Sequence, residues 1–479
     1  MLGTSLPELV FIRISIYALR LIAPLSIVYL VASLHARKAL IYPWLFPIAV
    51  VEAAFYLFVF LPRRIQLQKA AVHPPLLSRE ERRELFDKCV GSMSAESTLL
   101  WFGKGASAVR RENAVDWLLW ALFSCSADSS LEEWQEELDY YVGEVSKFLG
   151  HPLDNGKNHK LKVMRLTLDP VIAIHRPFIW YMIICLIDTV ASILLFYHGF
   201  QHYNTHKWFH AFPPRPLLSL LSRRSADPDI PYWCRPHKST TKHPLVFIHG
   251  IGVGLYLYVP FFRELIAQDP DVGILALEIL PVSMHITYPP LQRDAMCAAV
   301  ARILDAHGIT RFAVASHSYG TVVTAHLLHS AILAPRIAGI LLVDPIPFLL
   351  HRADVAYNFV YRIPVHANQW QLWYFASRDA DVSRALSRHF FWQQNILFKE
   401  DLKGRRVAVV LAGEDQIVDT HAVDEYLTGV TPPPRKWKED GLEVLFFPKL
   451  DHAMVFDTKE RRKALLEIVR ELVQTDQSD

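Results

Sequence analysis

The sequence lacks the features that mark several classes of protein. It holds five cysteines among 479 residues, and they form no C-x-x-C pair and no cysteine–histidine spacing of a metal site. We therefore expect reduced thiols, no bound metal and no organic cofactor. The 50 basic residues are balanced by 48 acidic ones, so no basic field is available to attract nucleic acid. Internal repeats and low-complexity segments are also missing, which excludes solenoid and disordered architectures.

Apolar residues are abundant, at 52% of the chain, and they concentrate in the first two hundred positions. Residues 14–34 are interrupted only by Arg20, and residues 39–61 only by Glu52. Each run is long enough to cross a hydrocarbon core of roughly 30 Å. No basic segment precedes the first run and a second follows it closely, which favours two membrane helices over a cleaved signal peptide. Residues 1–72 are therefore predicted to form a membrane anchor.

The basic residues around these runs suggest an orientation. Arg37 and Lys38 lie between the runs, and the heavier cluster of Arg63, Arg64 and Lys69 follows the second. Because cytosolic flanks carry more Lys and Arg, the pattern predicts a hairpin with both ends in the cytosol. We expect an integral protein of an endomembrane, such as the endoplasmic reticulum, with its main domain on the cytosolic side.

Residues 73–206 are predicted to form a helical connector. Ser78 followed by Glu81 is a capping-box pattern, and we assign the connector no chemistry. A third apolar run, 178–197, carries Asp188 near its middle. It is either a third span with an inward-facing acid or a helix lying against the membrane. A third span would move everything after it to the opposite side.

Residues 207–242 are rich in proline and basic residues and are predicted to be a linker. From residue 243 to 475, short apolar runs alternate with helical patterns, which indicates an α/β domain built on a mostly parallel sheet. The expected strands are 245–248, 274–277, 312–315, 340–343, 407–411 and 444–447.

Ser318 is the predicted nucleophile. The strand 312–315 runs into Ser316-His317-Ser318-Tyr319-Gly320 and then into a helix. Such an abrupt turn strains its central residue and requires small neighbours two positions away on each side, as Ser316 and Gly320 are. Ser316 stands where glycine is usual. If Ser316 were the nucleophile, the bulky Val314 would occupy a position that needs a small residue. His317 is interpreted as structural or pocket-lining.

A serine hydroxyl needs a base and a group that orients the base, and both follow in order. Asp415 follows the strand 407–411, and His452 follows the strand 444–447. We expect His452 to act as the general base and Asp415 to hold its tautomer. Asp344, at the end of the strand 340–343, is an alternative third member.

Backbone amides should stabilise the oxyanion, and we expect the donors to be Tyr319 and Ile251. Ile251 lies in a turn after the first strand, where small residues allow close approach of the backbone. The supporting residues are His249, Gly250, Gly252 and Gly320. The same glycine-rich turn, with Glu278 after the next strand, weakly suggests dinucleotide binding, but Leu255 occupies the third glycine position.

The His249-Gly250 turn, the Ser-x-Ser-x-Gly elbow, the Gly413-Glu414-Asp415 turn and the late His452 together resemble the α/β-hydrolase superfamily over about 243–475. The architecture with an apolar N-terminal half resembles membrane-associated fungal hydrolases of that superfamily. The resemblance implies an α/β-hydrolase fold and an esterase- or lipase-like activity, without naming a substrate.

Residues 346–400 separate two strands by more than a crossover helix needs and are crowded with aromatic side chains. We expect a lid over an apolar pocket, or else an ordinary packed helical insert. The function expected from the whole pattern is that of a membrane-anchored serine hydrolase acting on an ester of a hydrophobic, lipid-like substrate. The alternatives are an acyltransferase or thioesterase using the same residues, and a non-catalytic membrane scaffold or receptor.

Overall fold

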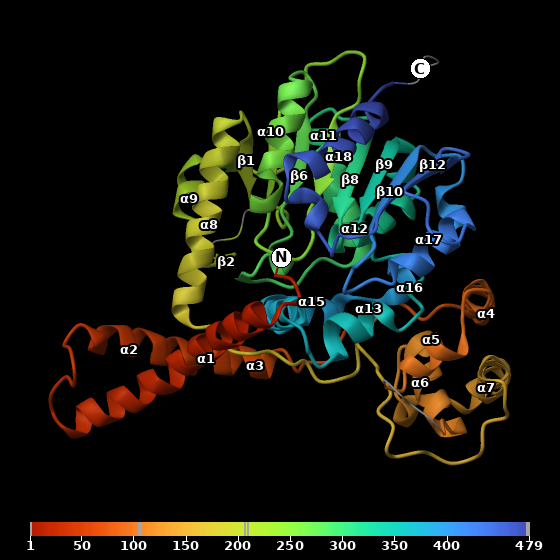
Figure 1. Cartoon of the computed structure of the whole chain (residues 1–479), viewed down its shortest axis with the longest axis horizontal. Coiled ribbons are helices and arrows are strands. Elements are labelled where there is room, and N and C mark those ends of the chain that lie inside the picture. Colours follow the sequence, from red (N-terminus) through yellow and green to blue (C-terminus); the bar gives the residue numbers. More distant parts are fainter. Residues whose placement is uncertain (1, 104–107, 206, 208–209, 476–479) are drawn as a thin grey trace.

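The computed structural model describes residues 2–103, 108–205, 207 and 210–475. Its centre is a ten-stranded sheet in the order β11-β12-β10-β9-β8-β5-β6-β4-β1-β3 (Figure 1). The six strands from β12 to β6 are parallel, and the expected mostly parallel sheet is confirmed. These strands are β5 (Leu245–Ile248), β6 (Ile274–Leu277), β8 (Phe312–His317), β9 (Ile337–Val343), β10 (Val407–Ala412) and β12 (Leu442–Phe447).

Helices cover both faces of the sheet. One face packs against α8 (Phe178–Tyr197), α10 (Val259–Gln268) and α18 (Lys459–Leu472), and the other against α11 (Arg293–Ala306), α12 (Tyr319–Leu328) and α17 (Thr420–Thr428). Because both faces are covered, the central strands are mostly apolar and their residues do not alternate between apolar and polar. Every residue of β5, β6, β8, β9 and β10 is buried.

The segment 207–242 is not a linker, and that expectation was wrong. It contributes β3 (Arg223–Arg224) and β4 (Tyr232–Arg235) to the main sheet, beside β1 (Gln201–Asn204). It also holds β2 (Ala211–Phe212), which pairs with β7 (Ile286–Thr287), and α9 (Pro216–Leu221). The α/β domain therefore begins near residue 201 instead of 243. Most of the prolines lie between these short elements, and Pro216 begins α9, which is why the composition resembles that of a linker.

The first helices form a hairpin that projects from the body (Figure 1). It consists of α1 (Leu6–His35), then α2 (Leu45–Ala54), a π-helical segment (Phe55–Phe60) and α3 (Leu61–Gln66). Among the residues that the structure describes, three helices could cross a membrane by length and composition: Leu6–His35, Leu45–Gln66 and Phe178–Tyr197.

The connector folds into α4 (Arg79–Val90), α5 (Ala95–Leu100), α6 (Arg111–Phe123) and α7 (Gln135–Leu149). The capping box predicted at Ser78 and Glu81 starts α4: each side chain is hydrogen-bonded to the other residue's backbone N–H, at 3.2 and 2.8 Å. The core of the connector is continuous with that of the α/β domain, so the two pack as one body.

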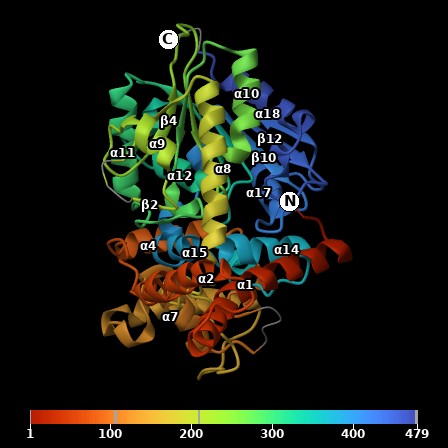
Figure 2. The same cartoon turned by 90° about the vertical axis from the view of Figure 1, so that its left-hand side faces the viewer.

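The insert between β9 and β10 covers one end of the sheet, and in Figure 2 its helices α14 and α15 lie between the sheet and the hairpin. It contains α13 (Asp354–Ala356), α14 (Ala367–Leu372), α15 (Ala380–His389) and α16 (Trp392–Asn395). Two π-helical segments, Tyr357–Tyr361 and Trp373–Ser377, follow α13 and α14. The antiparallel edge strand β11 (Lys436–Glu439) completes the sheet.

Candidate active site

Ser318 occupies the turn between β8 and α12 in a strained backbone conformation. Its φ is 51° and its ψ is −121°, which L-residues rarely adopt. The backbone N–H of Ser318 donates to the carbonyl of Val343 on the next strand, at 3.0 Å. A Cβ at Gly320 would lie 2.3 Å from the Ile248 carbonyl oxygen, so glycine is required there. Ser316 hydrogen-bonds to Thr324 at 2.8 Å, so a serine is accommodated in place of the usual glycine.

The structure brings Ser318, His452 and Asp415 together in one hydrogen-bonded chain. His452 Nε2 lies 2.8 Å from Ser318 Oγ, and His452 Nδ1 lies 2.7 Å from Asp415 Oδ2. The other oxygen of Asp415 accepts from the backbone N–H groups of Ile417 and Val418, at 2.7 and 3.1 Å. The carboxylate is thus fixed by its own turn before it meets the imidazole.

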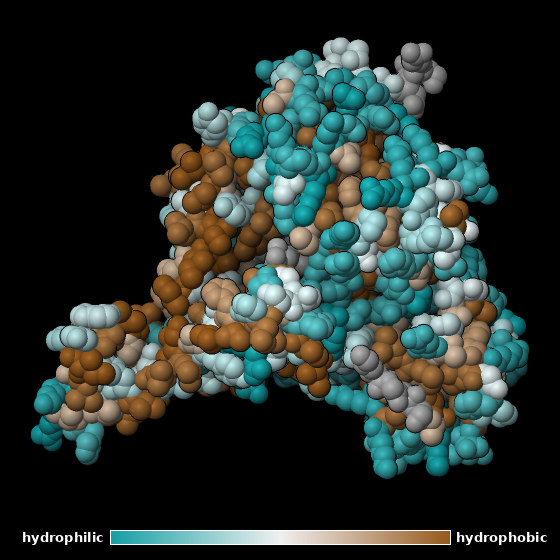
Figure 3. Space-filling model, in the orientation of Figure 1, coloured by the Kyte–Doolittle hydropathy of each residue, from teal (hydrophilic) through white to brown (hydrophobic). Residues whose placement is uncertain are grey.

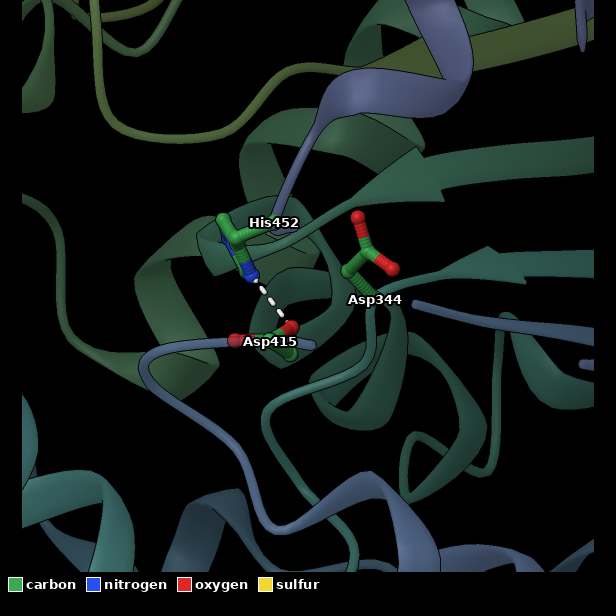
Figure 4. Close-up of side chains that lie close together, drawn as sticks. All are labelled: Asp344, Asp415 and His452. Carbon is green, nitrogen blue, oxygen red and sulfur yellow. Dashed lines mark hydrogen bonds and ion pairs between the residues drawn. The ribbon is translucent and has the colours of Figure 1, made fainter. Parts of the chain in front are cut away.

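Asp344 lies beside this chain but is directed elsewhere (Figure 4). Its Oδ2 accepts a 2.7 Å hydrogen bond from the backbone N–H of Ala453, the residue after the histidine. It therefore holds the loop that carries His452, whereas Asp415 holds the ring. Of the two acids considered from the sequence, Asp415 has the position of the orienting group.

The charges around His452 set its proton affinity. Burial alone would lower the pKa of His452, but the nearby carboxylates of Asp415, Asp344 and Asp451 outweigh burial and raise this pKa to about 9. The pKa of Asp415 is raised because its side chain is fully buried, against the opposing effect of His452. An imidazole with this many acidic neighbours is a strong base, so it holds a proton firmly once it has taken one.

A second series of buried hydrogen bonds stabilises the turn that carries Ser318. The backbone N–H of Gly250 donates to the Tyr258 hydroxyl at 3.2 Å, and that hydroxyl lies 2.7 Å from His317 Nδ1. His317 Nε2 faces Asp344 at 3.7 Å. This arrangement fits the structural role expected for His317. Tyr258 was not singled out from the sequence, since a tyrosine in the helical turn before α10 carries no motif.

Ile251 and Tyr319, whose backbone amides are the expected oxyanion donors, line the same cavity as Ser318. Among the described residues, the N–H groups of Ile251 and Tyr319 have no acceptor, whereas those of Gly250 and Gly252 are already bonded, to Tyr258 and to Val282. His249 stiffens the same turn, because its Nε2 accepts from the Ile279 N–H at 2.9 Å. The N–H groups of Ile251 and Tyr319, which were expected from the sequence to be the oxyanion donors, are therefore free to donate to a ligand.

Ser318 lines a largely apolar cavity. The insert supplies much of the wall, through Leu350, Val355, Ala356, Phe359, Val360, Leu386, Phe390 and Trp392. The insert therefore covers the site, as expected of a lid.

The connector, to which no chemistry was assigned from the sequence, also lines this cavity, through Trp101, Trp120 and Leu166. Trp101 Nε1 donates to the His351 carbonyl at 3.1 Å, and Trp120 Nε1 donates to Thr167 Oγ1 at 3.0 Å. These bonds fix both indoles. Nothing in the local sequence distinguishes these two tryptophans from ordinary core residues.

Not all the aromatic side chains of the insert face the cavity. Tyr374 packs in a separate cluster with Ile12 and Ile16 of α1, and Trp370, Trp373 and Phe375 pack against that cluster. The aromatic content of the insert thus serves two purposes: one set lines the cavity and the other docks the N-terminal helix.

A metal ion and a dinucleotide are two other ligands that the positions of the acidic residues concern. Ligand atoms of Asp344, Asp415 and His452 lie within 4.8 Å of one another, close enough to bind a metal ion. A metal on His452 Nδ1 would displace the proton that this nitrogen donates to Asp415. Glu278, considered for a ribose, is instead bonded to Arg215 at 2.6 and 2.8 Å, to His202 at 3.0 Å and to Trp233 at 3.1 Å. It has no capacity left for a nucleotide.

Comparison with known proteins agrees with this architecture. Residues 245–468 match the model of the alpha/beta hydrolase family. This segment has the α/β-hydrolase fold. No curated protein matches the sequence. The hydrolase-fold domain therefore has a family match over slightly less than half of the chain, and the hairpin and the connector lie outside that match.

Solved structures similar to the hydrolase-fold domain include carboxylesterase CesB from Bacillus subtilis, at 12% identity over 60% of this chain and 98% of that one, with a TM-score of 0.36. A carboxylesterase from Nitrososphaera gargenis matches at 13% identity over 51% and 95%, with a TM-score of 0.36. A bacterial membrane phospholipase A matches at 13% identity over 61% and 93%, with a TM-score of 0.40. Likeness of this degree says nothing about the substrate.

Proposed function

We propose that the protein is a membrane-anchored serine hydrolase that cleaves an ester of a hydrophobic, lipid-like substrate through an acyl-serine intermediate. The observation that carries the proposal is the continuous hydrogen-bonded chain from Ser318 through His452 to Asp415, at the edge of an apolar cavity. Neither a metal nor an organic cofactor takes part in this reaction.

In the first half of the reaction, Ser318 Oγ attacks the ester carbonyl carbon while His452 Nε2 takes the hydroxyl proton. Asp415 accepts the hydrogen bond of His452 Nδ1 and stabilises the imidazolium. The carbonyl oxygen becomes an oxyanion between the N–H groups of Ile251 and Tyr319, each of which contributes roughly 3 to 4 kcal/mol of transition-state stabilisation. The tetrahedral intermediate collapses, His452 returns the proton to the leaving alcohol, and an acyl-serine remains.

In the second half, water attacks the acyl-serine carbonyl and gives a proton to His452. Collapse of the second tetrahedral intermediate releases the carboxylic acid and returns the proton to Ser318. An alcohol or thiol could attack in place of water, and a thioester could replace the ester, so acyl transfer and thioester cleavage are the second candidate functions. The apolar lining of the cavity favours acyl transfer, because it restricts water near the acyl-serine.

Ester hydrolysis by the purified full chain tests the proposal. We expect wild-type protein to hydrolyse p-nitrophenyl esters of medium or long fatty acids, and Ser318→Ala to lose at least a thousandfold in kcat. Ser330→Ala, a change at a serine outside the cavity, serves as the control and should leave kcat unchanged. Equal rates for wild type and Ser318→Ala would refute the role of Ser318, and complete absence of turnover and acylation in wild type would favour a non-catalytic scaffold.

Adding a primary alcohol or a thiol to the same assay separates hydrolysis from transfer. If the protein is a hydrolase, the free acid remains the main product at modest nucleophile concentrations. If it is a transferase, the acyl ester or thioester of the added nucleophile dominates. The proposed location is an endomembrane, with the hydrolase-fold domain on the cytosolic side.

A further inference from the structure

Helix α8 has two different faces. Its inner face is buried against the hydrolase-fold domain through Tyr181, Ile184, Asp188, Ala191, Ser192 and Leu195. Its outer face exposes apolar residues at alternating intervals of four and three: Ile179, Ile183, Leu186, Val190, Ile193 and Tyr197. Asp188, the only charged residue of the helix, lies on the inner face.

Polar contacts fasten the inner face to the domain. Asp188 Oδ2 lies 2.7 Å from His285 Nε2 and 3.3 Å from Arg215 Nε. Arg215 in turn binds Glu278 at the end of β6. Burial alone would raise the pKa of Glu278, but Arg215 and His202 hold it well below its usual value, so the network stays charged. Asp188 is therefore paired with groups of the hydrolase-fold domain, and its presence in an apolar helix does not require α8 to cross the membrane.

The parts of the chain before and after α8 pack together. Trp101 of the connector donates to the carbonyl of His351, and Trp392 of the insert donates to the carbonyl of Ala121 at 2.9 Å. Both parts line the cavity in front of Ser318. If α8 crossed the bilayer, these parts would lie on opposite sides of it. The packing requires that the chain enter and leave α8 on one side of the membrane.

The chain also enters and leaves the hairpin on one side of the membrane. The N–H of Leu2 donates to Gln371 Oε1 at 2.9 Å, before α1 begins, and Arg63 in α3 binds Asp381. Both ends of the hairpin thus return to the insert. Glu52 of α2 joins the hairpin to α8, because its carboxylate accepts the Phe178 N–H at 2.7 Å and lies 2.9 Å from His175 Nε2.

The exposed apolar surface is continuous from the hairpin to α8. In Figure 3, hydrophobic residues cover the side of the molecule formed by α8 and extend along the projecting hairpin. Leu220 and Leu221 of the adjacent helix α9 enlarge this surface. The hairpin projects from the body while α8 runs across its direction (Figures 1 and 2). A hairpin inserted in a bilayer would therefore hold α8 along the membrane surface.

We infer that α8 is an in-plane membrane helix, whose outer face lies at the boundary between lipid headgroups and acyl chains. The partner is a phospholipid bilayer surface. The inference rests on the membrane anchor of the proposed function and adds that only the hairpin penetrates the bilayer, so that the connector, the hydrolase-fold domain and both ends of the hairpin share one side. Of the two roles considered for the third apolar run, this is the helix lying against the membrane.

Spin-label depth measurements on the full chain in phosphatidylcholine vesicles test this arrangement. Ile179, Leu186 and Ile193 are replaced by cysteine, one in each variant, in a background where the partly exposed Cys125, Cys185 and Cys297 are serine and the buried Cys89 and Cys234 are kept. We expect the three nitroxides to lie at similar shallow depths, shielded from a water-soluble nickel chelate. Leu25→Cys in α1 should be deep and Lys463→Cys in α18 fully accessible to the chelate.

A helix rises about 1.5 Å per residue, so a spanning α8 would place the Leu186 label about 10 Å deeper than the Ile179 label, and this would overturn the inference. Three labels as accessible as Lys463→Cys would also overturn it, while a deep Leu25→Cys label would leave the anchor intact. If the Leu25 label too is accessible, the anchor itself fails. Labelling of Ser318 by a serine-directed probe in the same samples reports separately on the hydrolase assignment.

Discussion

Two buried carboxylates lie beside His452, and their positions give them different tasks. Asp415 faces Nδ1 of the ring, while Asp344 accepts the backbone N–H of the next residue. Both add negative charge near the imidazole, and both contribute to raising its pKa to about 9. Since a general base must be neutral to accept a proton, the rate should rise with pH as His452 loses its proton.

Asp344→Asn should move the pH dependence of kcat/KM without abolishing activity. The asparagine oxygen can still accept the Ala453 N–H, but one negative charge near His452 is lost, so the pKa of His452 falls. We expect the midpoint of the rising limb to move about one pH unit toward acid. Asp415→Asn is the comparison and should lower kcat by roughly a thousandfold or more, because the ring loses its orienting partner. If the rising limb of the pH profile does not move in Asp344→Asn, the charge of Asp344 does not raise the pKa of His452.

At this scale much of the site could be predicted from the sequence, because each strand of a parallel sheet delivers its last residues to the same edge. Ser318, Asp415 and His452 follow three such strands, and they meet in the structure. Tyr258 and the direction of Asp344 could not be predicted, since both depend on side-chain contacts between segments far apart in the chain.

At the scale of elements, the cavity is made by three parts of the chain that meet only in the folded protein. The strand ends supply the polar groups, the insert supplies one apolar wall, and the connector supplies Trp101 and Trp120. The length and aromatic content of the insert were visible in the sequence. The contribution of the connector was not, because a buried tryptophan has the same local pattern whether it faces a core or a cavity.

Trp120→Leu should enlarge the cavity and change the preference for acyl length. We expect the ratio of kcat/KM for long-chain over short-chain p-nitrophenyl esters to rise roughly tenfold, because the removed ring gives space to additional methylene groups. Trp134→Leu is the matched control. Trp134 lies in the same connector, and its ring centroid is 4.8 Å from that of Phe123, away from the cavity. An equal change of the ratio in both variants would mean a general loosening of the connector.

The short strands in the proline-rich segment were the part of the fold that could least be predicted from the sequence. The proline-rich segment 207–242 was expected to be a linker, yet its β4 pairs antiparallel with β6 at four positions. Short strands next to prolines give no alternating pattern long enough to detect. Their pairing is decided by the neighbouring strand, which the local sequence does not contain.

At the level of the whole molecule, the hairpin and the body are joined by the apolar cluster around Tyr374 and by a few buried polar contacts. Arg63 at the end of the hairpin binds Asp381 of α15, whose side chain is 1% exposed, and donates to the Thr287 carbonyl at 3.0 Å. Arg384 contacts the same carboxylate at 2.6 Å. Burial raises the pKa of Asp381 to about 6 despite both arginines. The hairpin is thus fastened to the insert that covers the site.

Arg63→Met should weaken this attachment. Removing one partner of a buried ion pair leaves the other incompletely compensated, and we expect a loss of about 3 kcal/mol in the free energy of unfolding, measured by denaturant titration in detergent. Arg79→Met is the control: its pair with Glu136 is exposed and should be worth less than about 1 kcal/mol. If Arg63→Met costs no more than the control, Arg63 does not fasten the hairpin. The double variant with Asp381→Asn should lose less than the sum of the two single changes.

Labelling with a fluorophosphonate probe tests whether Ser318 is the nucleophile. The probe phosphonylates an activated serine and stops there, so the result does not depend on knowing the substrate. We expect wild-type protein in membranes to be labelled, the adduct to map by mass spectrometry to Ser318, and Ser318→Ala to remain unlabelled while folding normally. Undiminished labelling of Ser318→Ala, or an adduct on another serine, would contradict the account.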